Sequence, residues 1–180
     1  PGYNAEALTL LMIKKNLRLL ELPIKARMRN VDFKKIDGGL LIQEEDVKDF
    51  KKEDLRVVTK RKPSKKEMEA LLFAWKVVKH VKSNAIVLAH GCQTVGIGMG
   101  QTSRVDSIYM AIKRAGKRAK GAVMASDAFF PKEDNVALAK KAGITAVIQP
   151  GGSISDEDIV RAADKAKIAM VFTGFRHFKH

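Results

Sequence analysis

Residues 121–131 have the sequence Gly-Ala-Val-Met-Ala-Ser-Asp-Ala-Phe-Phe-Pro, an apolar run followed directly by polar and aromatic residues and a proline. The apolar part, 121–125, predicts a buried strand. An acid and two aromatics then stand just beyond its carboxyl end, and in open α/β sheets ligands bind at that edge. A polar group beside exposed apolar rings suits an aromatic, partly ionised ligand. This stretch therefore predicts both a sheet and a binding site on it.

Helical and strand patterns alternate on both sides of this stretch. Ser64 and Glu67 have the spacing of a capping box, and Ser155 precedes three acids that suit the first turn of a helix. The elements expected are a helix from Ser64 to Val81, a hairpin of 85–89 and 94–97, helices 103–118, 134–142 and 156–166, and strands 121–125, 145–149 and 168–173. A hairpin that leads into alternating helices and strands predicts an α/β fold with a mixed sheet and helices on both faces.

The first 62 residues show weaker patterns. Asn4 is a candidate cap for a helix that runs to about Lys15, and 17–22 has the pattern of a strand stopped by a proline. Two short strands, 32–36 and 39–43, are expected around an Asp-Gly turn. This segment is too irregular for a complete domain, so we expect a boundary between residues 62 and 63.

The composition excludes several classes of protein. The chain has 180 residues, of which 46% are hydrophobic, so a folded core is expected and disorder is not. No apolar stretch approaches the ~20 residues of a membrane span, and the first residues lack the pattern of a secretory signal. The lone Cys92 has no partner for an internal disulfide, which is typical of a reducing compartment. We therefore expect a cytoplasmic protein with no membrane partner.

The net charge of +14 has three explanations. Clustered lysines and arginines bind nucleic acid by neutralising phosphates, a positive field attracts small polyanions, and a Lys-rich surface needs neither partner. The basic residues alternate with Glu and Asp along the expected helices and form no long block with interleaved aromatics. This spacing disfavours nucleic acid and leaves the other two explanations open.

Several runs, taken in order, resemble one family. They are 75–84 (Trp-Lys-Val-Val-Lys-His-Val-Lys-Ser-Asn), 96–104 (Gly-Ile-Gly-Met-Gly-Gln-Thr-Ser-Arg), 126–131, 149–153 (Gln-Pro-Gly-Gly-Ser) and 172–180 (Phe-Thr-Gly-Phe-Arg-His-Phe-Lys-His). Together they resemble the C-terminal part of AICAR transformylase, the formyltransferase of the bifunctional purine biosynthesis protein. The likeness is nearly unbroken from about Val57 and weaker over 1–18. It implies that 63–180 is the second of two cytidine-deaminase-like three-layer α/β/α repeats, and that 1–62 is the tail of the first repeat plus a connection.

The resemblance also implies a reaction, the transfer of a formyl group from 10-formyltetrahydrofolate to the amine of aminoimidazole carboxamide ribonucleotide in the synthesis of IMP. The family uses a Lys-His pair in a Lys-His-x-Asn-Pro motif of the first repeat, which this sequence lacks. Lys79-His80 is similar only locally, because Ser83-Asn84 follows it and the match is to the second repeat. We therefore assign no catalytic residue and expect a substrate- and folate-binding part, present as a fragment, a processed product or a subunit. It would form a homodimer or pair with a chain that carries the first repeat. The alternative is a non-catalytic nucleotide- and folate-binding regulatory module.

The residues that the resemblance assigns to the ribonucleotide are Asn84, Arg104, Phe129 and Arg176. The amide of Asn84 donates and accepts hydrogen bonds, as a carboxamide ligand requires; the alternative is a polar residue that starts a strand. Residues 96–100 are not the dinucleotide fingerprint, but we expect their bare backbone at the start of a helix, where free N–H groups attract anions. For Arg104 the alternative is a surface side chain after a tight turn, and for Arg176 it is a frayed tail.

The aromatic pair and the residues after it provide the folate side. Two adjacent aromatics at a strand exit cannot both point inward, so we expect one of them to line a pocket. The resemblance makes Phe129 the stacking face for the imidazole and assigns the folate to Pro131 and Asp134. An acceptor-only carboxylate suits the N–H edge of a pterin; the alternative for Asp134 is a helix N-cap.

Metal chemistry is limited by the residues present. Zinc deaminases with this type of fold need His-x-Glu and Pro-Cys-x-x-Cys, and the sequence has neither, so zinc is not expected. In some relatives the neighbourhood of Ser83 holds a structural monovalent cation, and potassium is therefore an alternative use of that segment. Asp127 is expected to be structural, orienting its loop or approaching this cation.

Overall fold

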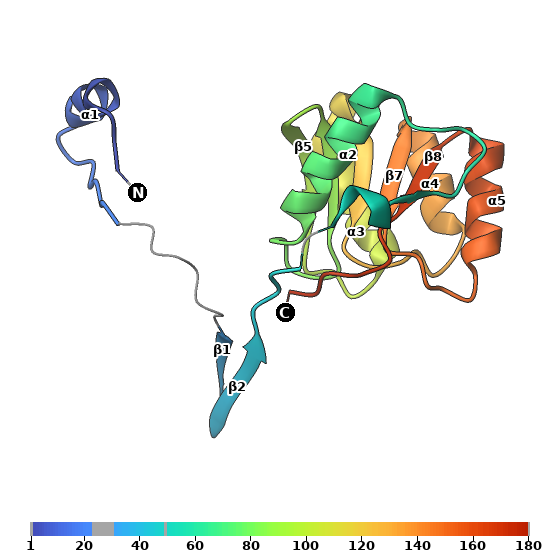
Figure 1. Ribbon diagram of the computed structural model, residues 1–180, viewed down its shortest axis with the longest axis horizontal. Helices are drawn as coiled ribbons and strands as arrows, with labels where there is room; N and C mark the ends of the chain where they lie inside the picture. The colour runs from blue at the N-terminus through green and yellow to red at the C-terminus, as the bar shows by residue number, and fades with distance from the viewer. Residues whose placement is uncertain (1, 23–30, 49, 180) are drawn as a thin grey trace. The chain divides into compact units, whose positions relative to one another are not determined.

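The computed structural model describes residues 2–22, 31–48 and 50–179. It divides the chain into two compact units, Pro1–Val47 and Lys48–His180 (Figure 1). The larger unit thus begins well before the boundary expected at residue 63, because residues 56–57 already form a strand of its sheet. The organisation into two family repeats stays a prediction.

The smaller unit contains one helix and one hairpin. Helix α1 (Ala5–Met12) begins at the expected cap, where Asn4 Oδ1 accepts a hydrogen bond of 2.7 Å from the Ala7 backbone. The hairpin of β1 (Val31–Ile36) and β2 (Gly39–Glu44) is also confirmed. The strand predicted at 17–22 is wrong. A short apolar run becomes a strand only beside another strand, and the described residues provide none there.

The larger unit is built on a six-stranded mixed sheet in the order β3-β8-β7-β6-β4-β5. Strands β6, β7 and β8 are parallel, whereas β4 runs antiparallel to both β5 and β6, and β3 antiparallel to β8. The bounds are β3 Arg56–Val57, β4 Ile86–His90, β5 Gln93–Gly98, β6 Val123–Ser126, β7 Ala146–Gln149 and β8 Ala169–Phe172. The α/β class and the mixed sheet are thereby confirmed.

Helices cover both faces of this sheet, as predicted (Figure 1). On one face, α2 buries Leu71 and Trp75 against alternate strand residues such as Val87. On the other, α3, α4 and α5 pack on the intervening residues, among them Ile86 and Met124. The helices are α2 Lys65–Val78, α3 Arg104–Ala115, α4 Asp134–Ala142 and α5 Asp156–Ala166, with short 3-10 turns at Lys52–Asp54 and Gly116–Ala119. The side-chain period of 2 in each strand divides the core into two layers.

The glycines of 96–100 have a packing role that the sequence analysis did not anticipate. Gly96 and Gly98 lie within β5, not at the helix start. A β-carbon on Gly98 would overlap the carbonyl oxygen of Ser107 in α3 and lie 2.7 Å from its carbonyl carbon. The expectation of a bare backbone that attracts anions is therefore wrong for these two glycines, which instead allow α3 to contact the strand closely.

Two helix starts differ in how they are capped. Ser64 Oγ accepts from the Glu67 backbone and Glu67 Oε2 accepts from the Ser64 backbone, at 3.2 and 2.8 Å, which confirms the capping box. Ser155 occupies the cap position of α5 but makes no side-chain cap bond. There the carboxylate of Asp156 accepts from the Gly152 backbone at 2.7 Å instead.

Glu67→Gln is expected to lower the free energy of unfolding by about 1 kcal/mol near neutral pH, because it keeps the capping-box acceptor but removes the negative charge that pairs with Arg61 and lies in the first turn of the helix. Burial tends to raise the pKa of Glu67, but hydrogen bonds from the Ser64 backbone and the Arg61 side chain, with the charge of Arg61, hold this pKa below its ordinary value. Because the pKa of Glu67 is lower in the folded state than in the unfolded state, its ionised carboxylate stabilises the fold at pH values above the unfolded-state pKa. This stabilisation is lost as the pH falls through the folded-state pKa.

The measurement is urea unfolding of wild type and variant as pH is lowered from about 7 to below 4.5. The difference between them should shrink over this range, while Glu69→Gln, an exposed change on the same helix, should have a smaller effect at every pH. A difference that is independent of pH would contradict this role of the Glu67 charge.

Candidate functional site

All the predicted site residues lie beyond one edge of the large sheet. The carboxyl ends of β6, β7 and β8 meet there because these strands are parallel. Ile86, at the start of β4, pairs with both Ser126 and Gly98, which brings the start of β4 and the end of β5 to the same edge. This is the edge where open α/β sheets bind ligands.

A buried ion pair forms the centre of this edge. Arg104 Nη1 lies 2.5 Å from Asp127 Oδ1, and the two residues are only 6% and 1% exposed. The same nitrogen donates to Ser126 Oγ at 2.7 Å and to the Ala85 carbonyl at 3.4 Å. The alternative that Arg104 is a surface side chain is therefore wrong, because its guanidinium turns inward to Asp127, which follows β6.

Asn84 joins this pair through its side chain. Its Oδ1 accepts from Arg104 Nη2 at 2.9 Å, while its Nδ2 donates to the carbonyls of Gln101 and Thr102 at 3.0 and 3.2 Å. The amide therefore donates and accepts at once, with protein partners. It holds the loop before α3 against the start of β4.

The C-terminal tail is pinned onto the same centre. Ser83 Oγ donates to Asp127 Oδ2 at 2.6 Å and accepts from the Lys179 backbone at 3.1 Å, and the His177 backbone donates to the Asp127 carbonyl at 2.9 Å. The rings of Phe175 and His177 also pack on Trp75. The tail is therefore ordered and not frayed, and the structural role expected for Asp127 is confirmed.

Arg176 projects from this pinned tail. Its side chain is exposed, and its guanidinium lies 4.7 Å from the ring centroid of Phe178. Among the described residues it makes no hydrogen bond to Asn84 or Arg104. The structure thus brings Asn84 and Arg104 into direct contact and leaves Arg176 as a separate exposed cation at the same edge.

The aromatic pair divides as predicted. Phe130 is fully buried, and its backbone donates to Gln149 Oε1 at 2.8 Å, whereas Phe129 stays half-buried. The buried Gln149 was not singled out from the sequence as a support of this loop, although it lies within a matching run. Backbone N–H groups in a buried loop need hydrogen-bond acceptors, and this requirement is the signal that would have pointed to Gln149.

Pro131 and Asp134 are both exposed beyond β6. Asp134 is the first residue of α4, and Glu133 occupies the cap position without a side-chain cap bond. The N-cap alternative for Asp134 is therefore wrong. Its Oδ1 accepts from Asn135 Nδ2 at 2.9 Å, and the carboxylate stands in solvent.

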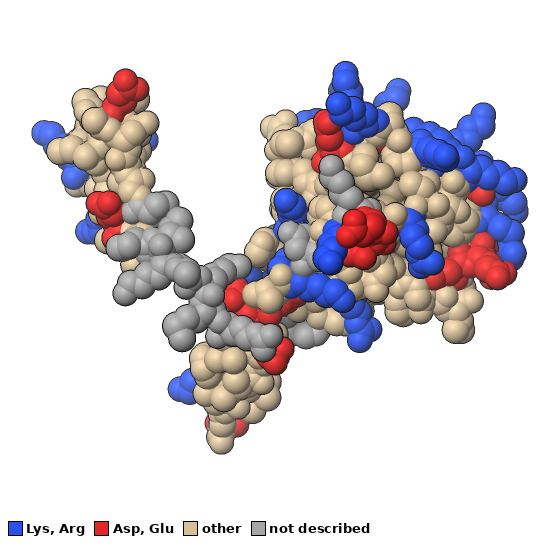
Figure 2. Space-filling model, in the orientation of Figure 1, with Lys and Arg blue, Asp and Glu red and all other residues tan. Residues whose placement is uncertain are grey.

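Charged side chains are distributed over the larger unit. On the face shown in Figure 2, Lys and Arg lie around its outline with Asp and Glu among them. The ranges described contain no group of three or more His, Cys, Asp or Glu placed to hold a metal ion. No helix in those ranges is long and apolar enough to cross a membrane.

A mixed sheet covered by helices on both faces, with polar and aromatic side chains beyond one edge, defines an α/β domain. The family model of the AICARFT/IMPCHase bienzyme matches residues 1–114. The chain belongs to this family, as its resemblance indicated.

Relatives match over the whole chain. Each of three is named bifunctional purine biosynthesis protein PurH. The protein of Halalkalibacterium halodurans is 57% identical over 181 residues, that of Thermoanaerobacter sp. (strain X514) 57% over 180, and that of Bacillus subtilis (strain 168) 54% over 181. All of this chain is covered but only 35% of each relative, so the chain spans about a third of their length. The chain is therefore similar to one part of these bifunctional proteins.

One solved structure has a weak likeness. RibD of Acinetobacter baumannii (form 2) matches with a TM-score of 0.37 and 17% identity, over 57% of this chain and 33% of that one. A likeness at this level does not assign the fold to a narrower class.

Proposed function

We propose that this chain forms the part of AICAR transformylase that binds the ribonucleotide and the folate. The enzyme would transfer a formyl group from 10-formyltetrahydrofolate to the amine of aminoimidazole carboxamide ribonucleotide, in the cytoplasmic synthesis of IMP. The observation that supports this most is the gathering of all the resemblance-derived ligand residues beyond one sheet edge. In this proposal residues 63–180 are a cytidine-deaminase-like repeat.

The nucleotide side of the site is formed by a cation, a ring and an amide. The exposed Arg176 suits a phosphate or carboxamide, because its planar guanidinium donates two parallel hydrogen bonds. The half-buried Phe129 presents a face on which an imidazole can stack. Asn84 and Arg104 are hydrogen-bonded to each other, so only their remaining donor and acceptor groups could contact the ligand. Their main contribution would be to form a rigid wall of the site.

The folate side is formed by residues just after the aromatic pair. Asp134 accepts hydrogen bonds only, and its exposed carboxylate suits a pterin edge of N–H donors. Pro131 lies between Phe129 and Asp134 in sequence and would contact the same ligand. The two substrates would thus meet near Phe129.

Catalysis needs groups to which no residue of this chain has been assigned. The acceptor amine is a weak nucleophile, since its lone pair is delocalised. Transfer therefore needs close alignment of both substrates, a base for the amine proton and a cation for the oxyanion. The chain lacks the family's Lys-His-x-Asn-Pro motif, so its residues would bind and align while a partner repeat, in a homodimer or another chain, supplies the pair. A potassium ion near Ser83 would take neighbouring carbonyl oxygens, since both carboxylate oxygens of Asp127 already have partners.

Calorimetry of the 180-residue chain with the ribonucleotide and with a folate analogue tests this proposal. Arg176→Ala should weaken nucleotide binding by about 1.5–3 kcal/mol, the value of a charged hydrogen bond, and should change folate-analogue binding much less. Asp134→Ala should do the opposite. Lys140→Ala, an exposed change in the last turn of α4, is the matched control and should leave both affinities unchanged.

Both site variants should melt like the wild type, because both side chains are exposed. Equal weakening of both ligands by each variant, with melting unchanged, would refute the division into nucleotide and folate sides. Turnover by the chain alone is expected to be negligible, and near-normal turnover would make His80 a candidate base. Binding without turnover, even beside a chain that carries the first repeat, would favour the non-catalytic regulatory module.

A further inference from the structure

Lysines and arginines gather at the edge of the large sheet that lies opposite the candidate site. The amino-terminal ends of β6, β7 and β8 form this edge, α2 begins there, and α3, α4 and α5 end there. We call it the basic edge and define it by four segments, 58–66, 113–121, 141–145 and 164–168. They contain thirteen lysines and arginines and one acid, Asp164. In Figure 2, Lys and Arg line the upper border of the larger unit.

The segments of the basic edge contact one another, so their charges form one surface. The Gly121 backbone donates to the Gly143 carbonyl at 2.8 Å. Arg61 Nη1 donates to the Thr145 carbonyl at 3.1 Å. Neighbouring strands lie about 4.8 Å apart, so an edge formed by several strands is an extended strip. The spacing of basic residues along the chain disfavours nucleic acid, but the fold assembles a basic strip from segments that are separate in sequence.

Little negative charge balances these cations. The Asp164 carboxylate is half-buried and accepts from the Lys60 backbone at 2.8 Å. Glu67, which follows the first segment, pairs with Arg61 at 2.7 Å, and within the described ranges this is the one ion pair of the basic edge. The other lysines and arginines of the edge are exposed. The edge therefore has a positive potential that attracts anions.

Helix dipoles explain only part of this accumulation. Cations are favoured where a helix ends, which accounts for Lys113 and Arg114 in α3 and for Lys165 in α5. Lys65 and Lys66 instead stand in the first turn of α2, where the same dipole disfavours them. Like charges also repel one another and oppose the compact state. A ligand that carries many negative charges would offset both effects.

The surface chemistry of the basic edge distinguishes between polyanions. None of the exposed large apolar side chains described in the chain lies in its segments. A protein interface needs a desolvated core and is depleted in lysine, and a stable membrane attachment needs a second anchor besides basic residues. Single-stranded nucleic acid stacks its bases on aromatic rings. A duplex needs none of these features, because its phosphates alone supply non-specific binding.

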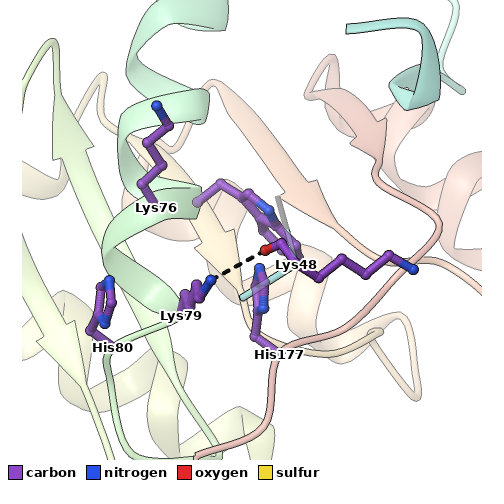
Figure 3. Close-up of a pocket in the computed structure, with 6 residues that line it drawn as sticks. Lys48, Lys76, Lys79, His80 and His177 are labelled. Carbon is purple, nitrogen blue, oxygen red and sulfur yellow. Dashed lines mark hydrogen bonds between the residues drawn. The ribbon is translucent and has the colours of Figure 1, made fainter. Parts of the chain in front are cut away.

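A cavity lined by lysines also exists, but at the other end of α2. It has a volume of about 200 Å³, and its lining includes Lys76 and His80 (Figure 3). Trp75, another lining residue, contacts His177 of the C-terminal tail. The cavity thus belongs to the edge of the candidate site. Lys76 therefore provides a cation that is remote from the basic edge.

We propose that the basic edge binds a nucleic-acid duplex through its phosphates, without reading the base sequence. The cations stand on loops and helix ends, so they would contact the backbone of the duplex, and base sequence is read by elements that enter a groove. The basic edge shares no residue with the ligand site proposed above, so the inference stands independently of the transformylase proposal.

Fluorescence anisotropy of a labelled duplex of about 20 base pairs tests this proposal. The full 180-residue chain is titrated into the DNA duplex, and separately into an RNA duplex, at about 50 to 200 mM salt. Affinity should fall steeply as salt rises and should be equal for unrelated sequences, and a single strand of equal length should bind more weakly. Tighter binding of the RNA duplex would assign the edge to RNA, and tighter or equal binding of the DNA duplex to DNA.

Two double variants remove cations from separate segments of the basic edge. One is Lys117→Gln with Arg118→Gln, and the other is Lys60→Gln with Lys62→Gln. Each should lower the slope of log affinity against log salt by about 2, one phosphate contact for each cation, and weaken binding about tenfold or more at ~0.1 M salt. All four side chains are exposed, so both variants should keep the wild-type melting profile.

The matched control is Lys76→Gln with Lys82→Gln, which removes two exposed lysines near the opposite edge and should bind the duplex like the wild type. Equal weakening by this control would show that the general charge of the chain, and not the basic edge, binds the duplex. The proposal would also be overturned by no binding at the lowest salt, or by tighter binding of a single strand. A polyglutamate peptide or a phosphatidylserine vesicle that binds as tightly as the duplex would overturn it too. Wild-type duplex binding in Arg176→Ala would support it, even if the chain failed to bind the ribonucleotide.

Discussion

Asp127→Ala is expected to destabilise the larger unit by about 3–5 kcal/mol, because it leaves a buried guanidinium without its counter-charge. Arg104 and Asp127 are almost completely buried, and the carboxylate also accepts the Ser83 hydroxyl. Removing it breaks the ion pair and one attachment of the segment that holds the C-terminal tail. The loss should therefore be much larger than that of a surface pair.

Urea unfolding followed by the fluorescence of Trp75, which lies in the core of the larger unit, measures this loss. The matched control is Asp158→Ala, which breaks an exposed ion pair with Arg161 and should cost at most about 1 kcal/mol. The double variant Arg104→Met, Asp127→Leu should recover much of the stability, since apolar replacements of a buried pair are tolerated. An equal loss in Asp127→Ala and Asp158→Ala would show that the buried pair is not structurally important.

Gly98→Ala is expected to destabilise the same unit by about 3 kcal/mol or more, at the upper end of the range for overpacking. The added β-carbon would meet the backbone of Ser107 and not the tip of a flexible side chain. Relief would require α3 to move away from β5. That movement would also displace Arg104, the first residue of the helix, from Asp127.

Thermal melting read from the same tryptophan tests this prediction. Gln93→Ala provides the control, since Gln93 is an exposed residue of the same strand. That variant should melt like the wild type. A Gly98→Ala protein with an unchanged melting temperature would mean that the helix can move away from the strand without loss.

The site was only partly predictable, because its residues act through partners distant in sequence. The sequence placed Asp127 and the two aromatics just beyond the carboxyl end of a strand, and their adjacency indicated that only one ring would be buried. The structure shows that this ring is Phe130. Nothing near Arg104 in the sequence indicates Asp127, with which it pairs from another strand end.

The sequence alone determined those elements whose signals are local. Helices 134–142 and 156–166 agree with their predicted bounds, and the capping box at Ser64 and the Asn4 cap lie where they were expected, because caps and helical periodicity depend on residues within a few positions. Tertiary structure decided the rest. The two-residue strand Arg56–Val57 exists only by pairing with β8, and 17–22 has no such neighbour. Gly96 and Gly98 are needed because the backbone of α3 packs directly against them, and no local sequence pattern specifies that contact.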